Sequence, residues 1–286
     1  MSETLAESGR ETRVLRMDDG ATADLVVYRP DGSIKGALLW IPALGVAARH
    51  YESFAVALAA HGIAVGVHEW RGHGSSDRRA SRRCDWGYRE LLVFDLPRSL
   101  ESLAACVPDV PLLVGGHSLG GQLACLLAAL TPVPLAGIAL VASGAPYWRK
   151  FRPWVWLAYA FAPLLARVVG RLPGRRIGFG GNEARGVVSD WARSGRTGTY
   201  VAAGLAVDLE GALRRQSAPV HSLRLCDDWM APAASLAFLV DKMPDAPHTA
   251  GVVSTTDLGG VRADHFAWIK RPEGVAQRLA GAILSR

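Results

Sequence analysis

Apolar residues fall along the chain in short continuous runs, and segments with helical spacing lie between these runs. The runs typical of buried strands are residues 36–41, 63–70, 111–114, 135–142, 222–226 and 250–254. The segments with helical spacing are residues 51–60, 88–106, 122–130, 233–242 and 273–284. A β-hairpin, residues 13–17 and 23–29, is predicted ahead of this series. Strands that alternate with helices predict an α/β fold with a mostly parallel, doubly wound sheet.

This alternation is interrupted between residues 143 and 218. The interruption contains an aromatic segment with helical spacing, a loop at residues 173–176 and a short helix near residues 187–193. An excursion that leaves the carboxyl end of a parallel sheet lies above the edge where α/β proteins bind ligands. We therefore expect a helical cap at residues 145–218, between a first part of the core (1–144) and a second part (219–286).

A Gly-His-Ser-Leu-Gly sequence, residues 116–120, stands where an apolar run ends and a helix of small residues begins. In this strand–turn–helix setting, G-x-S-x-G is typical of a nucleophile elbow that presents Ser118. Gly116 and Gly120 remove Cβ atoms where the neighbouring strand and the helix come closest. The amide of Leu119, at the start of the helix, would point to a developing oxyanion. An idle serine in a glycine-rich turn is the alternative interpretation.

The elbow is accompanied by other segments that carry a family resemblance. They are the loop after Ile41, the Arg-Gly-His-Gly-Ser-Ser loop at residues 71–76 and the triplet Asp264-His265-Phe266. Together these segments resemble the α/β-hydrolase superfamily over nearly the whole chain. More narrowly, the chain is similar to bacterial predicted α/β-hydrolases near the serine aminopeptidase and monoglyceride-lipase-like branch. The resemblance implies the α/β-hydrolase fold and a catalytic triad in the chain order serine, acid, histidine.

His265 is the expected general base, because no other histidine lies beyond position 248 and the base belongs in a loop after the last strand. The acid should follow the strand after the cap, and family members often show an aspartate four residues before a proline there. That spacing singles out Asp228, whose carboxylate would orient the imidazole, while Asp227 stays open as the alternative. His117 is expected to pack beneath the elbow.

The oxyanion hole needs a second backbone donor besides Leu119. Many relatives carry His-Gly after the strand that ends at Ile41, whereas this chain has Pro-Ala-Leu-Gly at residues 42–45. We expect the donor to be the amide of Leu44, with Ala43 as the alternative. The donor is main chain, so it tolerates this change of side chains.

Aromatic residues of the cap are candidates for holding a hydrophobic acyl group or alcohol. The substrate-binding candidates are Trp148, Trp154 and Tyr159, and Trp156 and Phe161 belong to the same segment. Packing of these rings between the cap and the core is an equally good interpretation.

The nucleophile narrows the expected chemistry. An aspartate would suit dehalogenation or epoxide opening, whereas a serine beside an imidazole suits acyl transfer to water through an acyl-enzyme. We therefore predict a serine hydrolase that cleaves a carboxylic ester or thioester of a small hydrophobic substrate, with amides also open. The alternatives are an acyltransferase with the same triad and a catalytically silent binding protein of this fold.

The composition and the missing motifs limit which partners, metals and cofactors we expect. The chain has 286 residues, a net charge of +6 and a pI near 9.4, with basic clusters at residues 78–83 and 149–152. A solvated basic face explains these clusters better than an anion site, and nothing resembles a nucleic-acid module. Metal-ligand spacings and phosphate loops are missing, and residues 178–181 lack the strand that a dinucleotide fingerprint requires, so neither a metal nor a cofactor is expected.

The cysteines, the N-terminal residues and the longest apolar run indicate the cellular compartment of the protein. The four cysteines lie far apart, at Cys84, Cys106, Cys125 and Cys226, which favours buried free thiols in a reducing compartment. The polar first sixteen residues do not have the pattern of a signal peptide. The longest apolar run, residues 153–166, is too short to span a bilayer. We expect a cytoplasmic protein, and the sequence does not indicate its oligomeric state.

Overall fold

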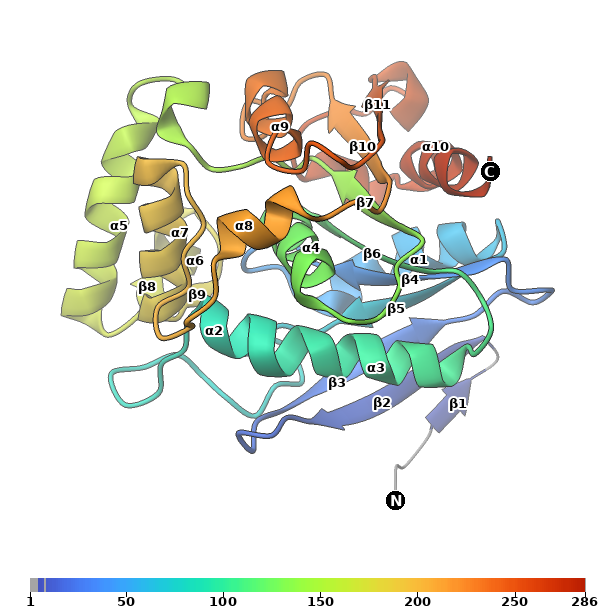
Figure 1. Ribbon diagram of the computed structural model, residues 1–286, viewed down its shortest axis with the longest axis horizontal. Helices are drawn as coiled ribbons and strands as arrows, with labels where there is room; N and C mark the ends of the chain where they lie inside the picture. Colours follow the sequence, from blue (N-terminus) through green and yellow to red (C-terminus); the bar gives the residue numbers. More distant parts are fainter. Residues whose placement is uncertain (1–4, 8, 286) are drawn as a thin grey trace.

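A computed structural model describes residues 5–7 and 9–285 of the chain (Figure 1). A nine-stranded sheet runs through the molecule in the order β1-β2-β3-β5-β4-β6-β7-β10-β11. Its strands are β1 (Leu5–Glu7), β2 (Arg10–Arg16), β3 (Thr22–Tyr28), β4 (Gly36–Ile41), β5 (Ile63–His68), β6 (Leu112–His117), β7 (Gly137–Val141), β10 (Val220–Leu225) and β11 (His248–Val253). The six strands from β5 to β11 pair in parallel, and the antiparallel hairpin β2–β3 joins them through β5. The prediction of a mostly parallel α/β sheet is confirmed.

Two apolar cores lie on opposite faces of this sheet, because successive side chains of a strand point to opposite faces. From β4, Leu39 and Ile41 pack on one face, while Leu38 and Trp40 pack on the other. Helices α3 (Leu96–Cys106), α4 (Leu119–Leu130), α8 (Leu209–Arg214) and α9 (Ala233–Val240) contribute to the first core, and α1 (Glu52–Ala59) and α10 (Glu273–Leu284) contribute to the second. The sheet is thus covered on both faces, as the sequence predicts.

Several elements differ in detail from the sequence prediction. The segment at 88–106 is one helical path, but it divides into α2 (Tyr88–Glu90), a π-helical turn (Leu91–Asp95) and α3. The carboxylate of Asp95, buried in that turn, accepts two hydrogen bonds from the guanidinium of Arg71. His248 is the first residue of β11, although the sequence analysis placed it before that strand.

The cap lies at the left of Figure 1 and consists mainly of α5 (Val155–Val169) and α7 (Arg185–Thr197). These two helices pack through the rings of Tyr159 and Trp191, whose centroids are 4.6 Å apart. Between them, β8 (Leu172–Pro173) pairs with β9 (Asn182–Glu183) around α6 (Gly174–Ile177). The loop expected at residues 173–176 is therefore mostly a short helix. At the other end of the predicted insertion, α8 packs on α4 and belongs to the core.

The remaining elements are single 3₁₀ turns. They lie at Ala48–Tyr51, Trp148–Lys150, Thr256–Leu258 and Ala267–Lys270. All four cysteines are free, but only Cys125 is fully buried, and Cys226 is exposed just past the end of β10. The expectation that Cys226 is a buried thiol is wrong, because its strand ends one residue earlier and its side chain enters a loop. Within the described residues, every helix falls short of the length and apolar character needed to cross a membrane.

Candidate active site

Ser118 lies at the turn between β6 and α4, with a backbone φ of 55° and ψ of −121°. This conformation is rare for a residue with a side chain, and it turns the serine out of the strand direction. A Cβ on Gly116 would collide with the backbone of Gly120, and a Cβ on Gly120 would collide with the carbonyl of Ile41. The two glycines of the motif therefore allow β4, β6 and α4 to meet directly beneath Ser118.

His265 and Asp228 lie together in loops that follow β11 and β10. The His265 Nδ1 atom is 2.8 Å from Asp228 Oδ2, and both side chains are buried. The other carboxylate oxygen of Asp228 accepts hydrogen bonds from the amides of Met230 and Ala231, at 2.8 and 3.1 Å. These contacts fix the carboxylate, which in turn favours the His265 tautomer with its proton on Nδ1 and a lone pair on Nε2.

Asp227 points elsewhere. Its carboxylate accepts hydrogen bonds from Thr255 Oγ1 and the Ala263 amide, at 3.3 and 3.2 Å, so it ties two loops together. Of the two aspartates that the sequence left open, the structure brings Asp228 to the imidazole. The Nε2 atom of His265 is buried and has no hydrogen-bond partner within the described part of the chain. Ser118 and His265 both line one cavity of about 240 Å³.

Leu44 and Leu119, the two expected oxyanion donors, line the same cavity. The Ala43 amide donates a 2.9 Å hydrogen bond to the hydroxyl of Tyr51, so it is already engaged. Among the described residues, the Leu44 amide donates no comparable hydrogen bond. Of the two donors considered from the sequence, Leu44 is the one with a free N–H, and Leu119 supplies a second at the start of α4.

Tyr51 is a buried residue of this site that sequence reasoning missed. Its hydroxyl accepts a hydrogen bond from the Ala43 amide and lies 2.8 Å from His117 Nδ1. Tyr51 therefore links the loop that carries Leu44 to the residue before Ser118. The His117 ring lies beneath that of His265, with the ring centroids 4.7 Å apart, in the packing position expected from the sequence. Burial, reinforced by the neighbouring His265, lowers the pKa of His117 well below 6.5, so this imidazole stays neutral. Burial raises the pKa of Tyr51.

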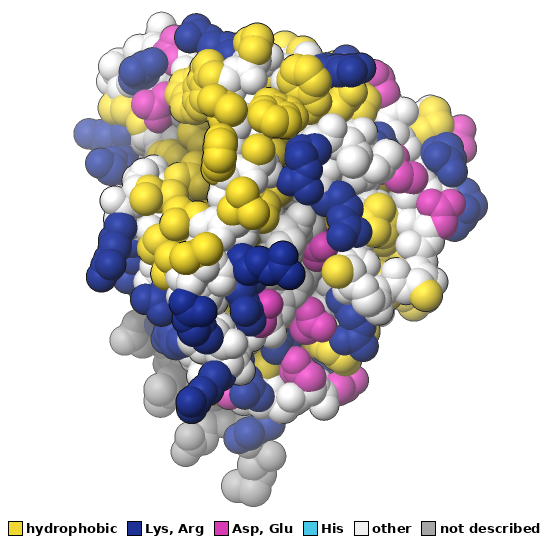
Figure 2. Space-filling view, turned by 90° about the vertical axis from the view of Figure 1, so that its left-hand side faces the viewer, with side chains coloured by type: hydrophobic (Ala, Val, Ile, Leu, Met, Phe, Trp, Pro, Cys, Tyr) yellow, Lys and Arg dark blue, Asp and Glu magenta, His cyan; other side chains and the backbone are white. Residues whose placement is uncertain are grey.

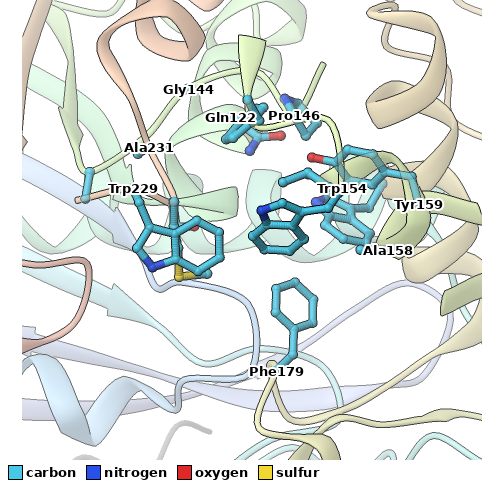
Figure 3. A pocket seen from close by; sticks show the side chains of 15 residues that line it. Gln122, Gly144, Pro146, Trp154, Ala158, Tyr159, Phe179, Trp229 and Ala231 are labelled. Carbon is cyan, nitrogen blue, oxygen red and sulfur yellow. The ribbon is translucent and has the colours of Figure 1, made fainter. Parts of the chain in front are cut away.

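An apolar chamber of about 150 Å³ extends from Ser118 under the cap (Figure 3). Trp154 and Tyr159 of the predicted substrate-binding set line it, together with Phe179 and Trp229. Trp148 lies outside the described lining and packs instead with a small cap cluster that includes Val155. The other two aromatic residues of this segment, Trp156 and Phe161, also lie outside the lining and are exposed.

Gln122 is a second residue that the sequence analysis did not single out, although it stands one helical turn after Ser118 on α4. It lines both the chamber and the cavity beside His265. Its Oε1 accepts a 3.2 Å hydrogen bond from the hydroxyl of Tyr200, which orients its amide group. The amide NH₂ therefore offers a polar contact in an otherwise apolar chamber.

The loop that carries Leu44 packs directly against the cap. A Cβ at Gly45, where φ is 80°, would collide with the backbone of Gly180 and Gly181. Next to this contact, His73 Nε2 lies 3.3 Å from Glu183 Oε1, which joins the 71–76 loop to β9 of the cap. The cap and the loop with Leu44 are thus held in one arrangement by buried contacts. Among the described residues, no group of three or more His, Cys, Asp or Glu side chains is arranged to hold a metal ion.

Comparisons with known proteins identify relatives by sequence and similar structures by fold. The matched stretch with the mouse and human monoglyceride lipases is 114 residues long, at 27% and 29% identity. It covers 40% of this chain and only 37% of the length of these relatives. The esterase domain of a Rhodothermus marinus protein superposes with a TM-score of 0.61 at 14% identity, over 100% of this chain and 98% of that one.

A solved structure described under the metagenome-derived lipolytic enzymes LipS and LipT has a TM-score of 0.62 at 16% identity, and covers 91% of this chain and 97% of that one. At such low identities these two similarities concern the fold alone. The model of the family "Serine aminopeptidase, S33" matches residues 32–193, more than half of the chain. The chain therefore belongs to the serine aminopeptidase family S33, a hydrolase family with the α/β-hydrolase fold.

Proposed function

We propose that this protein is a serine esterase that cleaves a carboxylic ester of a small hydrophobic substrate through an acyl-enzyme on Ser118. The observation that carries the proposal is the buried pair His265–Asp228, at 2.8 Å, whose free Nε2 belongs to a residue lining the same cavity as Ser118. Family membership and the similarity to monoglyceride lipases support ester hydrolysis as the reaction class.

In the proposed first half-reaction, His265 Nε2 removes the proton of Ser118 as the serine oxygen attacks the ester carbonyl. The Leu44 and Leu119 amides stabilise the oxyanion of the tetrahedral intermediate. The protonated His265 then gives its proton to the leaving alcohol, and the C–O bond breaks to leave the acyl-enzyme. Asp228 stabilises the imidazolium throughout, because its carboxylate is already held by two backbone amides.

Water completes the cycle by the reverse roles. His265 takes a proton from the attacking water, and Ser118 leaves with that proton while the free acid forms. The walls of the chamber provide the specificity, because Trp154, Tyr159 and Phe179 present apolar surface to the acyl group or the alcohol. Such a chamber favours esters with apolar chains over charged substrates.

A fluorophosphonate probe tests the nucleophile directly. We expect a covalent adduct on Ser118 in the folded protein, no adduct in Ser118→Ala, and a loss of several orders of magnitude in the hydrolysis of p-nitrophenyl esters by that variant. A panel of p-nitrophenyl esters with different acyl chains then measures which chain length the chamber accepts. Folded protein that neither reacts with the probe nor turns over any ester would overturn the proposal in favour of a binding protein. If acyl transfer to an added alcohol is faster than hydrolysis, the protein is an acyltransferase instead.

A further inference from the structure

Helix α5 of the cap exposes an apolar face to solvent. Val155, Tyr159 and Ala166 face inward and are buried. The large side chains on the outward face are exposed to between 37% and 69%, and they are Trp154, Trp156, Leu157, Phe161, Leu164, Leu165, Val168 and Val169. Figure 2 looks onto this side of the molecule and shows the hydrophobic side chains gathered in its upper half. An exposed apolar face of this extent on one helix marks an interaction surface.

Positive charge surrounds this face without any negative charge from the same segment. From residue 145 to residue 182 the chain has seven Lys or Arg residues and no Asp or Glu. Arg149 and Arg152 are exposed before the helix, Arg167 within it, and Arg175 and Arg176 after it. Arg82 contacts the backbone at the end of α5 through the carbonyl of Val168. Dark blue side chains accordingly lie among and around the yellow ones in Figure 2.

We propose that the outward face of α5 docks the protein on the surface of an anionic lipid bilayer. Apolar side chains on one side of a helix, with arginine and lysine beside them, suit the boundary between acyl chains and phosphate headgroups. A second copy of this chain fits less well. In a symmetric dimer the same patch meets itself, so the arginines of both copies would approach each other with no carboxylate from residues 145–182 to neutralise them.

The docked face lies next to the entrance of the chamber. Trp154 lines the chamber and is also half exposed, and its ring lies 5.3 Å from that of Trp229, which is likewise half exposed. These two rings connect the apolar surface of α5 to the path toward Ser118. This part of the inference rests on the proposed function, since it makes esters within a lipid layer accessible to the nucleophile.

Co-sedimentation with vesicles tests the docking independently of catalysis. One set of vesicles is phosphatidylcholine alone, and a second contains about one third phosphatidylglycerol. We expect binding to the second set to be at least about tenfold stronger and to weaken as salt screens the charges. The variant Phe161→Gln/Leu164→Gln/Val168→Gln should lose about tenfold or more of this binding, because it removes apolar area without changing the charge.

The matched control is Val14→Gln/Val56→Gln/Val252→Gln, three similarly exposed residues on other elements, and it should bind like the wild type. Soluble p-nitrophenyl ester hydrolysis checks that each variant is folded, since none of the six residues lines the chamber. Absence of vesicle binding by the wild type, or equal loss in both triple variants, would overturn the docking even with hydrolysis intact. So would a wild-type dimer that only the α5 variant dissociates. The Ser118→Ala variant should still bind vesicles although it does not hydrolyse esters, so docking and catalysis can be tested separately.

Discussion

Helices α4 and α5 are both apolar on nearly all sides, yet they have opposite environments. In α4 the first nine residues are buried, between the sheet and α8. In α5 only three of fifteen residues are buried, because α7 covers one side and no other described element covers the opposite side. An apolar helix is therefore buried in one region of this molecule and largely exposed in another. At α4 it fixes the elbow rigidly beneath Ser118, and at α5 it leaves a surface available for contact.

The comparison assigns chemistry to the region around α4 and recognition to the region around α5. Changes at the buried end of α4 and its partners should affect turnover or folding. Changes at Phe161, Leu164 or Val168 on the outward face of α5, which do not line the chamber, should leave folding and the turnover of soluble esters intact.

The largest expected effect comes from Asp228, the proposed triad acid. Asp228→Asn should lower kcat for ester hydrolysis by about ten-thousandfold, because an amide favours the wrong histidine tautomer and does not stabilise the imidazolium. Asp227→Asn is the matched control and should lower kcat by less than about tenfold, since its carboxylate only ties two loops. Steady-state kinetics on a p-nitrophenyl ester measure both. Equal losses in the two variants would contradict the assignment of Asp228.

The helices themselves can be compared by truncating one leucine in each. Leu123→Ala in α4 should lower the free energy of unfolding by about 2–5 kcal/mol, because it leaves a cavity in the core. Leu164→Ala in α5 should change it by less than about 0.5 kcal/mol, since that side chain is 57% exposed. Urea denaturation measures both values. A similar cost at the two positions would mean that the outward face of α5 is covered in solution.

Acid should destabilise the core through two buried histidines, His68 at the end of β5 and His117 at the end of β6. Burial lowers the pKa of His68 from 6.5 to about 3, and burial likewise lowers that of His117. Below pH 6.5 the unfolded chain takes up protons that the folded protein does not bind, so stability falls as the pH drops toward 3. Charging His68 in the unfolded chain should cost about 2 kcal/mol of stability between neutral pH and about pH 5.

Urea denaturation at several pH values measures how steeply the free energy of unfolding falls with pH. His68→Gln should make the fall of stability with pH shallower, because it removes a group whose pKa burial lowers. An unchanged slope in His68→Gln would show that this imidazole does not stay neutral in the folded protein.

The smallest expected effect concerns Gln122, whose amide faces the chamber from α4. Gln122→Met keeps the volume and removes the polar contact, so kcat/KM for esters with a hydroxyl or carbonyl in the alcohol part should fall by about tenfold or less. Esters with purely apolar alcohols should be unaffected. Tyr200→Phe, which only releases the Gln122 side chain, should show a weaker form of the same preference. A uniform loss over all esters would indicate a structural role instead.

Much of the fold follows from the sequence because it depends on local patterns. Continuous apolar runs mark β4, β5 and β6, and the glycines around Ser118 mark the elbow, since only residues without a Cβ fit where Ile41 and Gly120 lie. The resemblance to α/β-hydrolases, through its chain order of serine, acid and histidine and its aspartate before a proline, pointed to His265 and the pair Asp227–Asp228. The π-helical turn at Leu91–Asp95 could not be predicted in this way, and the buried salt bridge between Asp95 of this turn and Arg71 joins residues distant in sequence.

By itself, then, the sequence determined the alternation of strands and helices and the elbow, and its resemblance to α/β-hydrolases pointed to the two loops that hold the proposed acid and base. Those features depend on residue type and spacing within a few positions. Only the tertiary structure decided which aspartate reaches His265, that Tyr51 occupies the Ala43 amide, and which face of α5 is left uncovered. These outcomes depend on atoms far apart in the chain, and an apolar residue has the same local pattern whether a neighbouring element covers it or not.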